Sequence, residues 1–559
     1  MIARYMSVVA LQNDRSSASA DDFDLMLFDR LRARALARPD APCVIEAESG
    51  LTLSYGAFFA ATLGLRRRLG PTPRVIALQA PGCALAAITW IAALTGGHTL
   101  IPLPTAAPLP EINALLRRMP PDALVLDDAA DAGDARLTAT AAQQISAPER
   151  IARNGFAPWL GERGAPTASA AQTAAQTDVP DPQPGQLFLT TSGSTGEPKG
   201  VLLQARQIAW TAEQIRLNHA LTPQDRGLTP LPFFHINAPV VSLCASLLAG
   251  SAVVIAPQFS RSGFWSQIER HGVTWASLVP TIVALLLDNP EPVTTPASLR
   301  FVRTASAPLP AAHMRAFQQR FGVPVIETYG LTEAASQICA NPAPPKQRKP
   351  GSVGLPTGIA LRIVRPAQGD DTTLRDAPPG TVGEVCVCGP NIIPAYAEGR
   401  GASAFCDGWF RTGDLGYQDA DGYLFLTGRL RDIIIHGGEN VSPREVEETL
   451  LAHPAVTEAA VFGAPDRVYG ELVVACVTLR VPWTVALNDT LRALCAEQLA
   501  RYKCPTRIIP LPAMPRTNAG KLDRPRLRAE WARPDAVGGR RPSDNRAARP
   551  STLALRATK

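Results

Sequence analysis

The sequence predicts an α/β protein with a large N-terminal body built on parallel sheets and a small α+β domain towards its C-terminal end. The 559 residues exceed what one hydrophobic core usually holds, so two or more domains are expected. Short apolar runs alternate with segments of helical periodicity through most of the chain, which is typical of βαβ units. After residue 428 the pattern changes to a compact α/β unit.

The N-terminal part starts with a segment, 1–22, that we expect to be disordered, followed by a helix over 24–37 with acidic residues at its start. Residues 75–102 then alternate strand, helix and strand, and such a βαβ unit requires parallel pairing. A short strand is expected at 124–126. The Ala-, Gln-, Asp- and Pro-rich stretch from 127 to 184 has weak periodicity and is expected to be a surface excursion.

A second alternating series follows in the middle of the chain. Its helices, which have apolar residues at helical spacing, are expected at 207–218, 239–249 and 261–271. Its strands are short apolar runs, expected at 187–189, 201–203, 252–255, 275–279, 301–303 and 323–326. Shorter β-structure is expected from 353 to 387. In the small domain we expect helices at 443–451 and 486–499 and strands at 433–435, 456–462 and 472–479.

Charge and cysteine usage narrow the class of partners. The net charge is +6, but residues 533–559 hold seven basic and two acidic side chains, so the rest of the chain is close to neutral. We therefore expect no nucleic-acid partner.

No apolar run reaches membrane-spanning length and the N-terminus lacks a secretory signal, so a cytoplasmic location is expected. Ten scattered cysteines without paired spacing predict free thiols.

The loop TSGSTGEPKG at 191–200 carries the most specific chemistry in the chain. Its glycines let backbone N–H groups approach a ligand closely, its hydroxyls donate hydrogen bonds, and Lys199 adds a positive charge. The spacing differs from that of the P-loop and of dinucleotide-binding folds. A flexible Ser/Gly hairpin is the alternative, but the two flanking strands hold the loop in register. The loop therefore predicts a polyphosphate site.

Six motifs in order resemble the signature of the adenylate-forming enzymes, which include acyl-CoA synthetases, adenylation domains and luciferases. After the phosphate loop they are PLPFFHIN (230–237), ETYGLTE (327–333), DGWFRTGDLG (407–416), GRLRDIIIHGGENVSPREVEE (428–448) and PRTNAGKLDR (515–524). The resemblance implies a large AMP-binding domain at 23–429, a small mobile domain at 430–530 and a disordered basic tail at 531–559.

The same resemblance implies a set of site residues and the cofactors ATP, Mg²⁺ and CoA. Expected at the nucleotide are Thr191, Ser192, Gly193, Ser194, Thr195, Gly196, Lys199, Ser306, Ala307, Glu327, Thr328, Tyr329, Gly330, Thr332, Asp414 and Arg429. Expected in catalysis are Lys521, the Mg²⁺ ligand Glu333, and His235. Expected at the hinge is Arg431, where the family usually has Asp or Lys, and expected at CoA are Gly437, Gly438 and Glu439.

Each motif also has a structural alternative. Glu333 alone would be interpreted as a helix-capping acid, and Asp414 as the acid of an Asx-turn. Tyr329 is expected to stack on adenine, with a buried core position as the alternative. For Lys521 the alternative is an ordinary surface lysine, and for the two glycines of GGEN it is a plain β-turn. Intact Lys521, Asp414 and Glu333 nevertheless argue against a non-catalytic binding protein.

The residues of the expected acyl pocket indicate which class of carboxylic acid is activated. His235 stands where amino-acid-activating enzymes carry an Asp, so an amino acid is disfavoured. The segments 259–287, 301–310 and 340–354 resemble the branch that includes oxalate–CoA ligases. His235, Asn237, Arg303 and Ser306 are therefore expected to form a polar pocket for a small acid, although an apolar channel for longer acids stays open. An enzyme that loads the acid onto a carrier protein is the second interpretation.

Overall fold

The computed structural model describes residues 23–127, 149–152, 179–191, 199–291, 293–366, 373–399, 401–516 and 522–532. The disorder expected at 1–22 and from 533 onward lies outside these residues. Helix α16 (Arg524–Trp531) includes the first residue of the expected tail, and the side chain of Trp531 packs against a core cluster.

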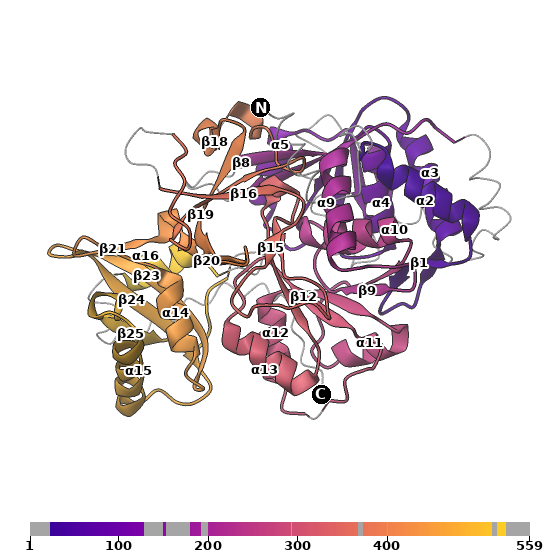
Figure 1. Cartoon of the computed structure of the whole chain (residues 1–559). Coiled ribbons are helices and arrows are strands. Elements are labelled where there is room, and N and C mark those ends of the chain that lie inside the picture. Colours follow the sequence, from indigo (N-terminus) through magenta and orange to yellow (C-terminus); the bar gives the residue numbers. More distant parts are fainter. Residues whose placement is uncertain are drawn as a thin grey trace.

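The first sheet of the large body has six described strands in the order β6-β5-β3-β4-β7-β8 (Figure 1). Their bounds are β3 Val75–Gln79, β4 Thr99–Pro102, β5 Ala123–Leu126, β6 Glu149–Ala152, β7 Gln186–Thr191 and β8 Lys199–Gln204. The expected βαβ unit is confirmed, since β3 and β4 pair in parallel across helix α4 (Ala84–Thr95). Strand β6 lies in the stretch where no strand was predicted, and only β8 pairs antiparallel.

The second sheet has nine described strands in the order β15-β14-β13-β12-β11-β9-β10-β1-β2. Their bounds are β1 Pro42–Glu46, β2 Thr52–Ser54, β9 Arg226–Thr229, β10 Ala252–Ile255, β11 Trp275–Leu278, β12 Phe301–Thr304, β13 Val325–Tyr329, β14 Cys339–Ala340 and β15 Leu355–Pro356. The six strands from β13 to β1 pair in parallel, and the remaining three pair antiparallel at the two ends.

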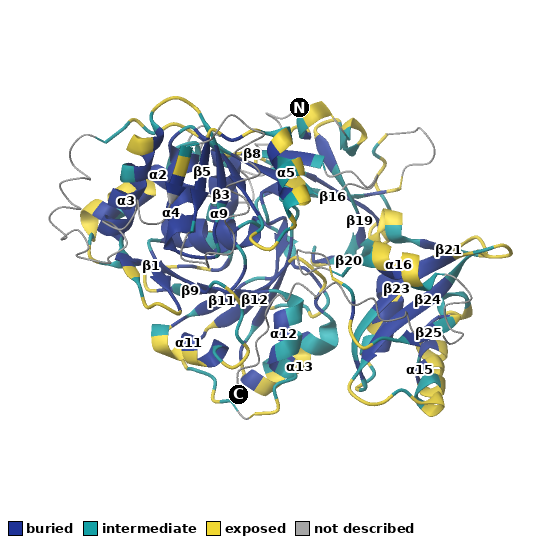
Figure 2. Cartoon of the chain, turned by 180° about the vertical axis from the view of Figure 1, so that it is seen from behind, coloured by how far each residue is buried: buried dark blue, intermediate teal, exposed yellow. Residues whose placement is uncertain are grey.

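Helices separate and cover these two sheets. All residues of α4 are buried because the helix contacts β3, β4 and β7 of one sheet and β1 of the other, which explains why its sequence is apolar on every side (Figure 2). Helices α11, α12 and α13 cover the opposite face of the nine-stranded sheet. The bounds of the helices are α2 Met26–Ala37, α3 Tyr55–Leu69, α5 Leu109–Arg118, α9 Ala205–Asn218, α10 Ala245–Ala249, α11 Phe264–His271, α12 Pro280–Leu287 and α13 Ala311–Phe321.

The helix expected at 239–249 has a different geometry from the one predicted. Its first part is the π-helix η3 (Asn237–Cys244), and only the last residues form the α-helix α10. Every residue of η3 is buried. Hydrophobic periodicity does not distinguish the i→i+5 bonding of a π-helix from that of an α-helix, and such turns are frequent at functional sites.

A third sheet follows the two sheets of the body along the chain and precedes the C-terminal unit. Its described strands are β16 Ala360–Val364, β17 Gly383–Cys388, β18 Phe405–Cys406, β19 Trp409–Gln418 and β20 Leu424–Arg429. The order is β16-β17-β19-β18, with β20 also paired to β19. Its last strand ends at Arg429, and a single turn of 3₁₀ helix, η7 (Leu430–Asp432), leads to the next sheet. The domain boundary expected at the hinge therefore falls on a short connection between two sheets.

The C-terminal unit has its own sheet and core and lies beside the body (Figure 1). Its described strands are β21 Ile434–His436, β22 Glu439–Val441, β23 Val456–Asp466, β24 Gly470–Leu479 and β25 Arg507–Pro510, and its helices are α14 Pro443–Leu451, α15 Val485–Gln498 and α16. The predicted fold class, a large α/β body and a small α+β unit, is confirmed.

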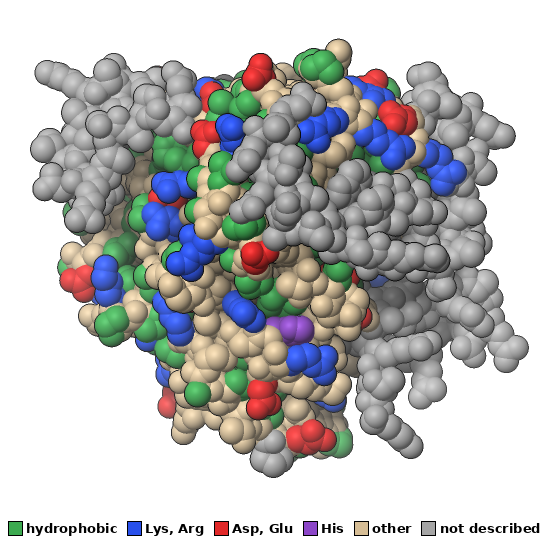
Figure 3. All heavy atoms as spheres, turned by 90° about the vertical axis from the view of Figure 1, so that its right-hand side faces the viewer, with side chains coloured by type: hydrophobic (Ala, Val, Ile, Leu, Met, Phe, Trp, Pro, Cys, Tyr) green, Lys and Arg blue, Asp and Glu red, His purple; other side chains and the backbone are tan. Residues whose placement is uncertain are grey.

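Surface charge and cysteines agree with the composition. On the face that Figure 3 shows, Lys and Arg side chains lie in several groups among neutral and acidic ones. All ten cysteines are described and free, as predicted. No helix within the described ranges is both long and apolar enough to cross a membrane.

Candidate active site

The phosphate loop connects two paired strands. Thr191 ends β7 and lies opposite Lys199, the first residue of β8. Ser192, Gly193, Ser194, Thr195 and Gly196 lie outside the described residues. The Lys199 Nζ sits 4.6 Å from the centre of the Tyr396 ring, a cation–π contact. A Cβ added to Gly401 would lie 2.8 Å from that Nζ, so this position has no room for a side chain unless the lysine moves.

The segment ETYGLTE begins in β13 and ends in the 3₁₀ helix η4 (Thr332–Ala334). Gly330 is required there, because a Cβ would lie 1.4 Å from the backbone oxygen of Ser336. The Glu333 side chain is buried and its Oε1 accepts a 2.8 Å hydrogen bond from the Tyr396 hydroxyl. No side chain caps η4, so the interpretation of Glu333 as a capping acid is wrong.

Asp414 is held by residues from two other segments. The Tyr329 hydroxyl donates to its Oδ2 at 2.6 Å, and the Arg429 Nε lies 2.9 Å from its Oδ1. Burial and the neighbouring carboxylate raise the pKa of Tyr329, which keeps the phenol a donor. The alternative interpretation of Asp414 as the acid of an Asx-turn is wrong, because the residue lies within β19, where Gly413 has a φ of +71° and the pairing with β17 shifts register. A β-bulge therefore aims this carboxylate.

Glu327 and Thr328 have side chains that are engaged inside the protein. The Glu327 Oε1 accepts from the Leu309 N–H at 3.2 Å, and burial raises the pKa of this carboxyl to about 7. The Thr328 hydroxyl donates to the Thr304 carbonyl at 3.1 Å. Both bonds hold the loop after β12, in which Ser306 and Ala307 are exposed. Ser306 has a φ of +74°, an uncommon conformation for a non-glycine residue.

Three of the four expected acyl-pocket residues, Asn237, Arg303 and Ser306, form a hydrogen-bonded chain. The Asn237 Nδ2 donates to the Ser306 hydroxyl at 3.1 Å, and the Arg303 Nη1 donates to the Asn237 Oδ1 at 3.0 Å. His235 is half-buried two residues before Asn237, with its ring against Phe234. The chain therefore runs from an exposed loop residue to a side chain, Arg303, that is 1% exposed.

Arg303 is a buried cation with neutral partners. Besides Asn237, its Nη groups lie 3.4 Å from the Ser277 hydroxyl and the Gln337 Oε1, two partners that the sequence did not indicate. Burial lowers the pKa of the guanidinium to about 9, so it remains charged near neutral pH. No carboxylate of the described residues lies within ion-pair distance of it. An unpaired buried charge is costly, and an anionic ligand would offset that cost.

The hinge and the GGEN segment lie on the surface. Arg431 is exposed, with its Nε 3.7 Å from the Asp432 carboxylate. Gly437 and Gly438 form a two-residue turn between the paired residues His436 and Glu439. Their φ values of +61° and +86° are those of a hairpin turn that favours glycine. The β-turn alternative therefore describes the local geometry, and an exposed hairpin tip is also accessible to a ligand.

Lys521 lies outside the described residues. The residues on either side are positioned, because Arg516 and Leu522 form an antiparallel bridge. The Arg516 side chain contacts Glu458 of the C-terminal unit and lies 3.4 Å from the Thr281 hydroxyl of α12 in the body. The motif PRTNAGKLDR therefore starts at a contact between the two parts of the chain.

The comparisons with known proteins identify the family. The model of the AMP-binding enzyme family matches residues 31–397, and that of its C-terminal domain matches residues 445–521. The chain belongs to the AMP-binding enzyme family. The resemblance predicted from the six motifs is thus confirmed.

Several relatives in this family are CoA ligases. The chain is 45% identical over 359 residues to a sulfoacetate–CoA ligase of Cupriavidus necator, a match that covers 63% of the chain and 69% of the relative. It is 39% identical over 353 residues to an oxalate–CoA ligase of Arabidopsis thaliana, covering 62% and 67%. These alignments span about two-thirds of each relative. They confirm the prediction of an AMP-forming acid–CoA ligase at the level of the family.

Two solved structures match this chain over nearly their whole length. ATP-bound MatB from Rhodopseudomonas palustris has 27% identity and a TM-score of 0.77, with 91% of this chain and 98% of that chain covered. The o-succinylbenzoate CoA synthetase of Bacillus subtilis in complex with ATP and magnesium has 30% identity and a TM-score of 0.73, with 90% and 98% covered. The family fold therefore extends through both parts of the chain.

Proposed function

We propose that the chain is an ATP-dependent ligase that joins a short carboxylic acid bearing a second anionic group to CoA, through an acyl-adenylate. The observation that carries the choice of acid is the buried Arg303, whose hydrogen-bond acceptors are all neutral. The relatives that act on sulfoacetate and oxalate, two small acids with a second acidic group, support this choice. CoA is the proposed thiol because those relatives are named as CoA ligases.

The residues of the site suit a magnesium nucleotide. Mg²⁺ is usually bound by one or two carboxylates together with substrate phosphates and water. Glu333 offers one buried carboxylate, and no cluster of three or more His, Cys, Asp or Glu ligands occurs among the described residues. Lys199 supplies a cation on the phosphate side, and Asp414 offers two oxygens to the ribose hydroxyls. ATP bound there would supply the activated phosphorus to which the acid is joined.

Arg303 can act on the acid through its hydrogen-bonded chain. Asn237 bridges the Arg303 guanidinium and the Ser306 hydroxyl on the exposed loop. A continuous chain of hydrogen bonds therefore links the loop to the buried charge. The effective dielectric constant of the interior is well below that of water, and this strengthens the attraction between the Arg303 charge and an anionic group. We therefore expect the second anionic group of the acid to be held at Ser306 and Asn237 with Arg303 behind them. His235 would line the same end of the pocket.

A panel of acids tests this function. We expect kcat/KM to be higher for sulfoacetate, oxalate or malonate than for butyrate, octanoate or an aromatic acid, measured as AMP and thioester formation with ATP and CoA. If the apolar helices η3, α10 and α12 instead enclosed a channel, each extra methylene would contribute ~0.8 kcal/mol, or about fourfold in kcat/KM. A steady climb from butyrate to octanoate without turnover of diacids would contradict the small-acid pocket and leave the ligase reaction intact.

Ser306→Ala separates a binding role from a structural one. Because Ser306 is exposed, its loss should leave folding intact. A lost hydrogen bond to a charged group amounts to ~1.5–3 kcal/mol, so we expect kcat/KM for the diacid to fall about ten-fold to hundred-fold, with monoacids affected less. Arg303→Lys should retain more diacid activity than Arg303→Gln, because only the former keeps the charge. An equal loss for diacids and monoacids in Ser306→Ala would contradict the assignment.

A further inference from the structure

One tyrosine outside every expected motif contacts two residues that are proposed to hold the magnesium nucleotide. The Tyr396 hydroxyl donates to the Glu333 carboxylate at 2.8 Å, and the Lys199 Nζ lies 4.6 Å from the centre of the same ring. Lys199 comes from β8, Glu333 from η4, and Tyr396 from the loop between β17 and β18. Side chains from three distant parts of the chain therefore meet at one phenol.

The loop that carries Tyr396 is fixed to the Glu333 segment by its backbone as well. The Ile393 N–H donates to the Glu333 carbonyl at 2.9 Å, and the Asn391 Nδ2 donates to the Ala334 carbonyl at 2.8 Å. On the far side of Tyr396, Arg118 of α5 binds both carboxylate oxygens of Glu398 at 2.9 Å. Tyr396 is thus held between two anchored points.

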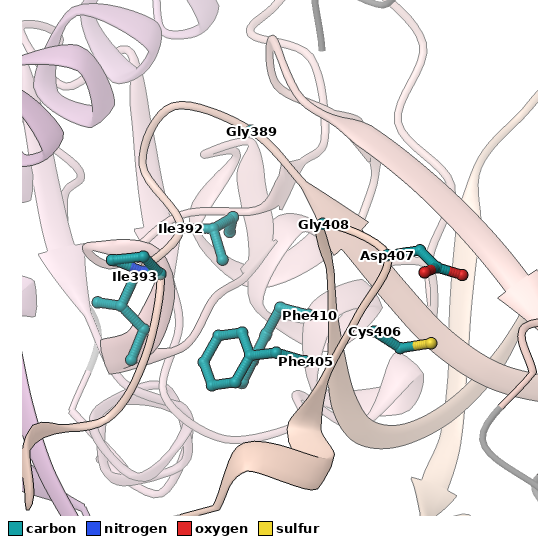
Figure 4. A pocket seen from close by; sticks show the side chains of 9 residues that line it. Gly389, Ile392, Ile393, Phe405, Cys406, Asp407, Gly408 and Phe410 are labelled. Atoms are coloured by element: carbon teal, nitrogen blue, oxygen red, sulfur yellow. The ribbon is translucent and has the colours of Figure 1, made fainter. Parts of the chain in front are cut away.

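The ring itself is packed from behind. Its centroid lies 5.8 Å from that of Phe405 and 6.4 Å from that of Phe410, and both contacts are edge-on. Figure 4 shows these two phenylalanines together, facing the Ile392 and Ile393 side of an open pocket of about 360 Å³. None of the expected site residues lines that pocket. Phe405 and Phe410 line this pocket and also pack against the Tyr396 ring, so they connect the ring to the wall of the pocket.

The chemistry of the phenol suits a fixed donor. A tyrosine hydroxyl is protonated at neutral pH, and that of Tyr396 donates its hydrogen to the Glu333 Oε1 at 2.8 Å. The ring face attracts the Lys199 ammonium at the same time. A hydrogen bond to one carboxylate oxygen leaves the other oxygen of Glu333 available to a metal ion.

We propose that Tyr396 is a positioning residue that holds the Glu333 carboxylate and the Lys199 ammonium in register for the magnesium nucleotide. This inference rests on the proposed function, which assigns the metal to Glu333 and the phosphates to Lys199. With Tyr396 in place, both charged groups are oriented before the ligand binds, and preorganised groups of this kind stabilise the charge that develops in the transition state. A tyrosine that only filled the core would influence both half-reactions alike.

Tyr396→Phe is the decisive variant, since it keeps the ring packing and the Lys199 contact and removes only the hydroxyl. We expect the half-saturating Mg²⁺ concentration in ATP–pyrophosphate exchange to rise about ten-fold or more, as for a lost hydrogen bond to a charged group. Thioester formation from preformed acyl-adenylate should be unchanged. Binding of Mn²⁺ in the presence of a non-hydrolysable ATP analogue, followed by electron paramagnetic resonance, should weaken by a similar factor.

Tyr423→Phe is the matched control, because Tyr423 makes the same two kinds of contact outside the site. Its hydroxyl donates to the Gln347 carbonyl at 2.8 Å and the Lys349 Nζ lies 4.6 Å from its ring centre. This variant should leave Mn²⁺ binding unchanged. An unaltered metal dependence in a folded Tyr396→Phe protein, or an equal loss in both half-reactions, would overturn the inference and leave the ligase function standing. A wild-type chain that bound no Mn²⁺–nucleotide would instead refute the proposed function.

Discussion

Replacing Lys521 by alanine is expected to abolish acyl-adenylate formation while thioester formation from a preformed acyl-adenylate stays near the wild-type rate. The first step brings a carboxylate against a triphosphate, so a cation at the reacting oxygens stabilises the transition state most. Loss of such a charge contact costs ~3–5 kcal/mol, about two to four decades in rate. Pyrophosphate release and ATP–pyrophosphate exchange measure the first step, and thioester formation from synthetic acyl-adenylate measures the second.

Lys503→Ala is the control for this experiment. Lys503 belongs to the same C-terminal unit and pairs with Glu445 at 2.7 Å, but Glu445 is largely exposed. Exposed pairs contribute about 0–1 kcal/mol, so neither half-reaction should change measurably. Undiminished pyrophosphate release in Lys521→Ala would remove this lysine from the adenylation step. A parallel loss of both half-reactions would assign it a general structural role.

Local patterns predicted the elements whose determinants are local. The βαβ unit at 75–102 was predicted because α4 is an apolar run of helical length between two short apolar runs. Helix α14 begins and ends where it was expected, and a proline near its N-terminus starts it. Strand β6 was missed because its four residues stand alone in a low-complexity stretch, and only pairing with β5 makes them a strand.

Within the site, the motif residues were predictable and their partners were not. Asp414, Glu333 and Arg303 were expected from the motifs in which they stand. The neutral partners of Arg303 are Asn237, Ser277 and Gln337. They belong to η3, β11 and the segment after η4, which lie close together only in the folded protein. Tyr396 was missed for the same reason, since the short loop that carries it has no pattern of its own. The aromatic residue in PAYAEGR was the only signal in the sequence.

A turn was the alternative interpretation of Asp414 because turns and β-bulges favour the same residues. Gly before Asp fits a turn with a positive φ, and Gly413 does have one. The flanking residues, however, pair with β17 on one side and β20 on the other, so the glycine makes a bulge inside a strand. A single sequence carries no signal that separates these two outcomes.

Gly438→Trp is expected to have the opposite effect to Lys521→Ala, leaving ATP–pyrophosphate exchange near normal and lowering CoA transfer about a hundred-fold or more. A Cβ at Gly438 meets no atom within 4 Å, so the indole would project from the hairpin tip into the space proposed for the thiol. A Cβ at Gly437 would lie 3.5 Å from the Tyr469 ring, an ordinary van der Waals contact, so Gly437→Trp is expected to act in the same way. Exchange and thioester formation are measured separately.

Gly438→Asn distinguishes bulk from backbone strain. The φ of +86° strains any side chain, but asparagine tolerates left-handed conformations far better than most residues. If the bulk of the side chain at the expected CoA site is responsible, the asparagine variant keeps both half-reactions and only the tryptophan variant loses CoA transfer. If the asparagine variant also loses CoA transfer, or if exchange falls together with transfer, the GGEN hairpin acts through its own conformation. The hairpin would then not line the path of the thiol, because distorting an exposed turn can lower CoA transfer without any contact with CoA.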